Sequence, residues 1–265
     1  MSNKNDRKRR KKKGDILSTI VIAIAASVFV FSLFMLADSL MPYFKGGKEY
    51  DEVRNLVIQQ EKVENEEGEE EERFVVDFNL LMEQNSDTIG WIRMDEPSVI
   101  SYPVVKSKDN NEYLTKTFTA NDNKLGTIFM DMNCASDFSG KNTIIYGHNM
   151  KVGGEMFSQL DSYKDADFCR ENPYFYIYTP DNKVRTYQIF SAGIIKDTAQ
   201  NYTVSFGSDD EFLNYLDICK ASSNYAVNVE LNKDSKIVTV STCTNVNDDE
   251  RFVVQGVLIE EEMNE

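Results

Sequence analysis

Apolar side chains follow two different patterns on either side of about residue 88. Before it, an uncharged run covers Ile16 to Ala37, twenty-two residues whose polar members are Ser18, Thr19, Ser27 and Ser32. After it, short apolar or alternating runs are separated by residues with turn chemistry, such as Asp109-Asn110-Asn111 and Pro180-Asp181-Asn182. The first pattern predicts a membrane-spanning helix and the second predicts strands.

The apolar run is long enough to cross a membrane. At a rise of ~1.5 Å per residue it spans the ~30 Å hydrocarbon layer. Because the apolar region of a cleaved secretory signal has only ~7–15 residues, we interpret residues 16–37 as an uncleaved signal anchor. Small residues at Ala23, Ala25 and Ala37 leave cleavage as the alternative.

The distribution of charge orients this anchor. The chain has 29 Lys and Arg against 44 Asp and Glu, a formal net charge of −15. Residues 1–15 hold eight basic and two acidic side chains, a local charge of +6, which leaves −21 for the rest. By the positive-inside rule, residues 1–15 form a basic cytoplasmic tip, and everything after about residue 40 lies outside the cell.

Residues 38–73 are predicted to be an acidic tether, helical in its first half and disordered after it. Val53, Leu56, Val57 and Val63 fall near helical spacing, whereas the run from Glu64 to Glu72 is too acidic to bury a core and should extend as a spacer. A cation or partner site is the less favoured interpretation of this run. Asp77 is expected to cap a short helix that carries Phe78 to Met82 and ends near Asn85, so the extracellular domain is placed at 74–265.

Eight short runs after residue 88 are candidate strands. Without regular helices between them, they favour a mainly β fold, an antiparallel or mixed barrel, over alternating strands and helices. Helical inserts are expected at Gly154–Tyr163 and Ser208–Ala221. The candidate strands are Thr88–Arg93, Val99–Val105, Gly126–Asp131, Thr143–Tyr146, Tyr174–Thr179, Arg185–Ile195, Lys236–Ser241 and Phe252–Ile259.

Composition excludes several classes of function. The acidic balance argues against nucleic acid as a partner, because phosphate binding needs a basic face. The chain has one histidine and four cysteines without a CxxC pair, so a metal site built on two imidazoles is excluded and a structural zinc site is not expected. We expect neither a metal ion nor a cofactor.

Three reactive side chains stand at predicted strand ends. His148 follows Thr143–Tyr146 through Gly147, Cys243 ends the run that begins at Lys236, and Arg251 opens the next run, across a hairpin from Cys243. A lone histidine is more often structural, and a strand-opening arginine is usually solvated. Together, however, the three have the elements of acyl transfer: a thiolate nucleophile, an imidazole that exchanges the proton, and a guanidinium for the oxyanion.

At these residues the sequence resembles the sortase family, class B. The resemblance covers roughly residues 75–260, with one conservative departure at Val240, where the family usually has leucine. Its motifs are Asn142-Thr143-Ile144-Ile145-Tyr146-Gly147-His148-Asn149-Met150, Thr239-Val240-Ser241-Thr242-Cys243, Arg251-Phe252-Val253-Val254, Gly90-Trp91-Ile92, Tyr102-Pro103-Val104-Val105, Asp109 to Leu114 and Gly126-Thr127-Ile128-Phe129-Met130-Asp131.

The resemblance implies an eight-stranded sortase barrel with N-terminal helices and a helical insert. It implies a membrane-bound cysteine transpeptidase, a thiol endopeptidase of Gram-positive type, that cuts a secreted protein's C-terminal sorting signal after threonine and transfers the acyl group to a peptidoglycan amine. Cys243 would be the nucleophile, His148 the acid/base and Arg251 the oxyanion stabiliser. Substrate contacts would come from Ser241, Asn110, Leu114 and Tyr202, and the class A calcium site is not expected.

Two other function classes stay open. A hydrolytic cysteine protease would use the same nucleophile but pass the acyl group to water. A membrane-tethered binding module would merely pack Cys243 and His148. We expect Cys243 to be a free thiol and Cys134, Cys169 and Cys219 to be reduced and at least partly buried.

Overall fold

The structure is a computed structural model that describes residues 3–64, 70–150 and 152–264. It divides into two compact units, Met1–Phe44 and Lys45–Glu265, and the long helix α1 (Asn3–Val57) runs from the first into the second. In the first unit, α1 carries the exposed apolar residues from Ile16 onward, and it is long and apolar enough to cross a membrane. This agrees with a single-pass anchor over residues 16–37.

The last turns of α1 belong to the second unit, which therefore begins before the predicted boundary at residue 74. Tyr50 is fully buried, and its hydroxyl donates to the carbonyl oxygen of Gly126 (2.6 Å) and accepts from the backbone N–H of Phe118 (3.2 Å). Val53 and Val57 are buried on the same helix. This anchoring depends on partners far along the chain, which local spacing does not reveal.

The acidic segment also differs from the expected tether. The helix ends at Val57 rather than extending to Val63, and β1 (Ile58–Glu64) pairs antiparallel with β2 (Glu70–Val76). The part of the acidic run at 65–69 lies outside the described residues. Phe74 packs on Tyr178 and lies under the guanidinium of Arg93, so aromatic and cation–π contacts supply stabilisation that the acidic composition conceals. The predicted capped helix is confirmed as α2 (Phe78–Gln84), with Asp77 accepting from Leu80 N–H.

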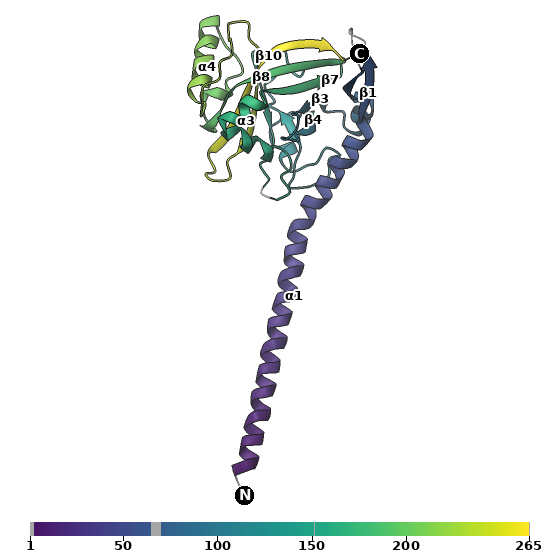
Figure 1. Ribbon diagram of the computed structural model, residues 1–265, viewed down its shortest axis with the longest axis vertical. Helices are drawn as coiled ribbons and strands as arrows, with labels where there is room; N and C mark the ends of the chain where they lie inside the picture. The colour runs from purple at the N-terminus through teal and green to yellow at the C-terminus, as the bar shows by residue number, and fades with distance from the viewer. Residues whose placement is uncertain (1–2, 65–69, 151, 265) are drawn as a thin grey trace. The chain divides into compact units, whose positions relative to one another are not determined.

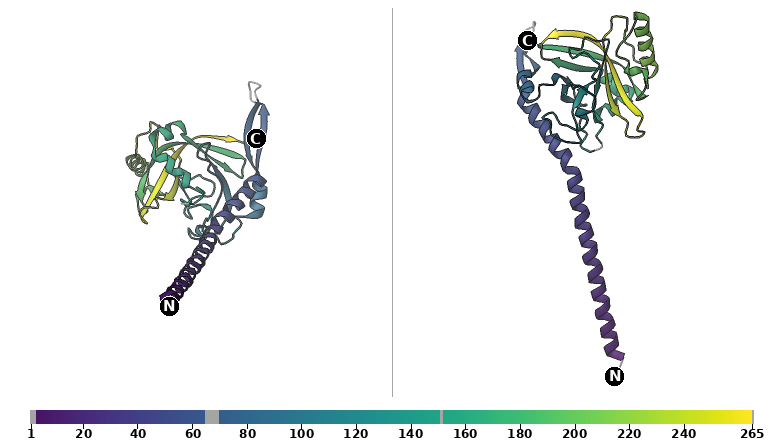
Figure 2. Two further views of the ribbon diagram at one scale, coloured as in Figure 1. Left: turned by 60° about the horizontal axis from the view of Figure 1, so that its bottom comes forward. Right: turned by 180° about the vertical axis from the view of Figure 1, so that it is seen from behind.

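Eight strands close into a barrel, as predicted (Figure 1). The order around the barrel is β10-β8-β7-β3-β4-β5-β6-β9, in which β4 with β5 and β6 with β9 are parallel pairs. Figure 2 shows the strands from two further sides. Their bounds are β3 (Thr88–Arg93), β4 (Ser101–Val105), β5 (Ile128–Met130), β6 (Asn142–Tyr146), β7 (Tyr174–Thr179), β8 (Lys183–Lys196), β9 (Ile237–Cys243) and β10 (Glu250–Met263).

One of the two predicted helical inserts is confirmed. The helix α4 (Asp209–Ala221) begins after the N-cap Ser208, and its apolar face packs on β8, β9 and β10 in a cluster that includes Phe190, Ile237 and Val257 (Figure 1). The helix predicted over Gly154–Tyr163 is wrong. A 3-10 helix η2 (Ser158–Lys164) and a short helix α3 (Ala166–Glu171) follow instead, because Gly153, Gly154 and Met156 have positive φ and interrupt helical geometry.

Candidate active site

Strand topology brings the three predicted catalytic residues to one edge of the barrel. Because β6 and β9 are parallel, His148 and Cys243 both lie where their strands leave the sheet. Arg251 is the register partner of Cys243 in the antiparallel pair of β9 and β10. All three line a cavity of about 290 Å³. The further lining residues are Asn110, Leu114, Phe129, Tyr146, Gly147, Asp197, Tyr202, Ser241 and Thr242.

The imidazole of His148 is held by a backbone carbonyl. Its Nε2 lies 2.8 Å from the carbonyl oxygen of Leu114, and since a carbonyl only accepts, Nε2 carries the hydrogen. In this tautomer Nδ1 is the ring nitrogen that can exchange a proton. Two glycines make room for this arrangement: a Cβ on Gly126, whose φ is +63°, would lie 3.0 Å from His148 Cδ2, and one on Gly147 would lie 2.6 Å from the ring of Phe157.

The thiol of Cys243 differs from the other three in its exposure. Cys243 is half-buried at the cavity, whereas Cys134, Cys169 and Cys219 are buried, and all four are free thiols. Burial raises the pKa of Cys134 and of Cys219 to about 11, and raises the pKa of Cys169 as well. These three thiols are therefore protonated at neutral pH and poor nucleophiles.

Hydrogen bonds join the loop that follows His148 to the loop that follows Cys243. The side-chain amide of Asn149 donates to the carbonyl oxygen of Cys243 (3.0 Å), and that of Asn245 donates back to the carbonyl oxygen of Asn149 (2.9 Å). These two bonds fix the spacing of the backbones that carry the thiol and the imidazole.

Hydrogen bonds and an ion pair also hold the guanidinium of Arg251 in place. Its Nη1 donates to the carbonyl oxygens of Asp248 (2.7 Å) and Glu250 (2.9 Å), and its Nη2 lies 3.7 Å from a carboxylate oxygen of Asp197. Sequence reasoning missed Asp197, because it follows a strand in the connection before α4 and belongs to no recognised motif. A positive charge held at this position can donate hydrogen bonds to a developing oxyanion.

Tyr202 and Ser241 form part of the cavity wall. The hydroxyls of Tyr202 and Ser241 lie 2.7 Å apart, and burial raises the pKa of Tyr202 to about 12, which keeps the phenol neutral. Tyr202 ends the 3-10 helix η3 (Gln200–Tyr202), and the buried amide of Asn142 donates to the carbonyl oxygens of Asn201 and Thr203 on either side of it. One side chain on β6 thus positions Tyr202.

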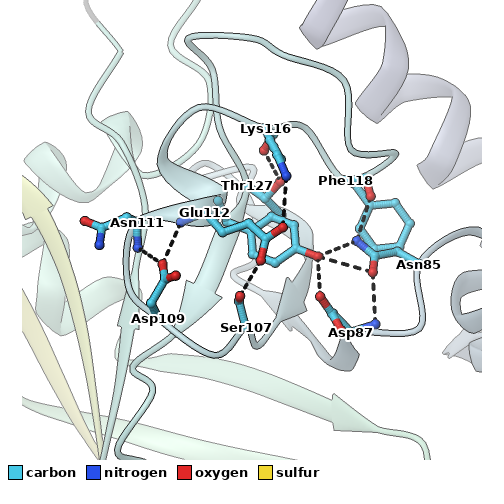
Figure 3. Close-up of polar contacts among 10 residues, drawn as sticks. Asn85, Asp87, Ser107, Asp109, Asn111, Glu112, Lys116, Phe118 and Thr127 are labelled. Carbon is cyan, nitrogen blue, oxygen red and sulfur yellow. Dashed lines mark hydrogen bonds and ion pairs between the residues drawn. The ribbon is translucent and has the colours of Figure 1, made fainter.

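Another part of the cavity wall is a loop that carries Asn110 and Leu114. Its 3-10 helix η1 (Glu112–Leu114) is anchored by Tyr113, which is 4 % exposed and whose hydroxyl donates to Asp87 (2.8 Å). Asn85 donates to the Tyr113 hydroxyl (3.0 Å), so the loop is tied to the segment between α2 and β3 (Figure 3).

Local hydrogen bonds stiffen the same loop (Figure 3). The carboxylate of Asp109 accepts from the backbone N–H groups of Asn111 (2.7 Å) and Glu112 (3.0 Å). The Glu112 carboxylate accepts from Ser107 and from Lys116 Nζ (2.9 Å). This wall is therefore preorganised although it has little regular structure.

The structure brings all seven predicted site residues to the cavity, and their chemical roles stay predictions. The cavity also has lining residues that were not predicted, among them Phe129, Tyr146 and Asp197. The first two fall within motifs that carry the family resemblance, so those motifs could have indicated them. Within residues 3–64, 70–150 and 152–264 there is no group of three or more His, Cys, Asp or Glu side chains placed to hold a metal ion.

Comparison with known proteins gives a consistent result. The sortase domain family matches residues 93–259. The chain is 35% identical over 183 residues to the sortase B of Listeria monocytogenes, covering 68% of this chain and 72% of that protein, and 32% identical over 187 residues to the sortase B of Staphylococcus aureus, covering 69% and 74%. The crystal structure of sortase B from Bacillus anthracis superposes with a TM-score of 0.71 at 29% identity, covering 83% of this chain and 99% of that one.

Proposed function

The chain belongs to class B of the sortase family, whose members are cysteine transpeptidases, and we propose that it attaches secreted proteins to peptidoglycan. In this proposal it cleaves a C-terminal sorting signal after threonine, holds the acyl group as a thioester on Cys243, and transfers it to a peptidoglycan amine. The observation that carries the proposal is the convergence of Cys243, His148 and Arg251 on one cavity.

The proposed first half-reaction forms the thioester. The Cys243 thiolate attacks the threonine carbonyl carbon, and Arg251 donates hydrogen bonds to the oxygen as it becomes an oxyanion. As the C–N bond breaks, the protonated imidazole of His148 gives its proton to the departing amine. The Leu114 carbonyl occupies Nε2, so Nδ1 is the nitrogen available for this exchange.

The proposed second half-reaction reverses these roles. A wall amine attacks the thioester carbonyl carbon, its proton passes to the neutral imidazole of His148, and Cys243 departs as the thiolate. An amide bond replaces the thioester, and the enzyme returns to its starting state. Water attacking in place of the amine would give hydrolysis instead, so the choice of acceptor separates a transpeptidase from a protease.

We further propose that the enzyme is a single-pass membrane protein with its N-terminus in the cytoplasm. Two features support this: the apolar helix from Ile16 onward and the +6 charge of residues 1–15. The catalytic domain would then stand outside the cell, where secreted proteins and peptidoglycan precursors meet.

Product analysis tests the proposal. The full chain in detergent micelles is incubated with a panel of threonine-containing sorting peptides, with triglycine or wall peptides as acceptors. We expect cleavage after threonine and a ligated product, both abolished in His148→Ala. Hydrolysis alone with every acceptor would identify a cysteine protease. Absence of cleavage, together with equal thiol labelling of native and denatured protein, would identify a binding module.

A further inference from the structure

A buried carboxylate lies behind the cavity wall, outside the catalytic residues already described. Asp131 follows β5 and is only 6 % exposed. Its Oδ1 accepts from the backbone N–H (2.8 Å) and side-chain amide (3.0 Å) of Asn133, and its Oδ2 accepts from the side-chain amide of Asn110 (2.8 Å) and the hydroxyl of Tyr146 (3.0 Å). One oxygen therefore serves a local turn and the other serves two residues of the cavity.

The four donors around Asp131 are neutral groups. Burying a carboxylate costs free energy that hydrogen bonds must offset, and a turn-stabilising aspartate needs only the Oδ1 contacts. Those contacts, made with Asn133 alone, do not explain why Oδ2 faces Asn110 and Tyr146. The two Oδ2 contacts point to a role in the cavity.

The amide of Asn110 is oriented at both ends. Its oxygen accepts from the backbone N–H of Met132 (2.8 Å) while its nitrogen donates to Asp131. An amide nitrogen carries two hydrogens, so one N–H of this cavity-lining residue stays available to a ligand. Because a carboxylate only accepts and the Met132 N–H only donates, the amide cannot flip without losing both bonds.

Tyr146 is held from the same side. Its ring packs on Phe129, with centroids 5.3 Å apart, and lies 6.2 Å from Tyr202. Burial and the neighbouring Asp131 carboxylate raise the pKa of Tyr146, in keeping with a phenol that donates its hydrogen to Asp131. The carboxylate thus fixes an aromatic face and an amide donor on one cavity wall.

We propose that Asp131 is a positioning residue for the peptide substrate: by holding Asn110 and Tyr146, it presents one fixed amide N–H beside an aromatic surface. Such a surface fits an extended peptide that offers a carbonyl oxygen to the N–H and apolar area to the ring. This inference rests on the proposed function and concerns the binding of the peptide. Asp131 acts through its two neighbours and does not touch the reacting atoms.

A double-mutant cycle on the full chain in detergent micelles tests this role. KM and kcat are measured with internally quenched peptides that contain a single threonine, for wild type, Asp131→Asn, Asn110→Ala and the double variant. We expect each single substitution to raise KM by up to about tenfold, the scale of one neutral hydrogen bond, with kcat within about twofold. Because Asp131 acts partly through Asn110, the loss in the double variant should be smaller than the two single losses combined. Asp137→Asn, an exposed aspartate on the same connection, is the matched control and should match wild type.

Several results would overturn the inference. An unchanged KM in Asp131→Asn would do so, as would additive effects in the double variant. A loss of kcat accompanied by slower Cys243 alkylation would also do so, because it would indicate a structural role. If Asp131→Asn does not fold, Asn110→Asp replaces it, because it places a second carboxylate against Asp131 and should raise KM more than Asn110→Ala does. Equal effects of these two variants would also contradict the inference. A wild type inactive toward every peptide would refute the proposed function itself.

Discussion

Arg251 lies directly opposite Cys243 in the antiparallel pair of β9 and β10. The pairing makes the distance between guanidinium and thiol a property of the sheet rather than of a mobile loop. The carbonyl oxygens of Asp248 and Glu250 hold the guanidinium further, through Nη1. The positively charged guanidinium is therefore held at the cavity in a fixed geometry, as stabilisation of an oxyanion requires.

Arg251→Lys should lower kcat/KM for peptide cleavage by about 10²-fold, the scale of losing an oxyanion donor. An ammonium keeps the charge but cannot bind two backbone carbonyls and still present a planar fork to the substrate. Steady-state kinetics with the quenched peptides measure the loss. Arg170→Lys, which alters an exposed arginine paired with Asp167, is the control and should match wild type. Full activity in Arg251→Lys would mean that charge alone suffices.

Native protein should react with iodoacetamide at Cys243 well before the other three thiols. Burial raises the pKa of Cys134 and Cys219 to about 11, so their thiolate fractions at pH 7.5 are very small. Peptide mapping by mass spectrometry should find one fast site in the native chain and four in urea. A stable disulfide at Cys243, or equal labelling of all four thiols without denaturant, contradicts the mechanism.

Gly126→Ala should reduce both stability and activity. At φ +63° a Cβ would lie 2.7 Å from the carbonyl oxygen of Tyr113, 2.9 Å from that of Leu114 and 3.0 Å from the His148 ring. We expect a loss on the order of 1–3 kcal/mol in the free energy of unfolding, measured in urea, and a lower kcat. The control is Gly140→Ala, where the nearest atom would be 3.7 Å away and little change is expected. A variant as stable and active as wild type would contradict this prediction, because it would show that the backbone at Tyr113 and Leu114 and the His148 ring can move to accept a Cβ.

The free energy of unfolding should fall as the pH rises above about 10. Burial raises the pKa of Tyr163, Tyr178 and Tyr202 from 10.0 to about 12. The unfolded chain therefore loses these protons first, so the stabilisation is complete below pH 10 and is lost as the pH approaches 12. Urea unfolding between pH 8 and 11 measures the decline. Tyr202→Phe should make it shallower, whereas Tyr174→Phe, at an exposed tyrosine, should not. A stability that stays level to pH 11 contradicts this account.

The strands were predictable because each is a local pattern. Short apolar and alternating runs such as Thr88–Arg93 and Tyr174–Thr179 are complete within six residues, and turn residues bound them. The capped helices behave similarly, since Asp77 and Ser208 cap through contacts only three residues away. The candidate site followed from motifs that stand at strand ends.

What could not be predicted depends on partners far apart in the sequence. Tyr50 is buried, and its hydrogen-bond partners lie 68 to 77 residues away in the sequence. Its own segment is polar, so the local pattern predicts a tether. The pairing of β1 with β2 was not predicted, because the acidic composition of these strands is typical of a disordered segment. Asp131 gives no local signal for its contact with Asn110, which spans 21 residues. The left-handed geometry of Met156 likewise has no signature in its residue type.

The intact mass of the full chain, mixed with a threonine-containing sorting peptide and no added amine, tests the central claim most directly. We predict an adduct equal to the peptide fragment ending in threonine, located on Cys243 by peptide mapping, absent in Cys243→Ala and released as a ligated product on adding triglycine. Cleavage with no adduct, undiminished in Cys243→Ala, would contradict the account.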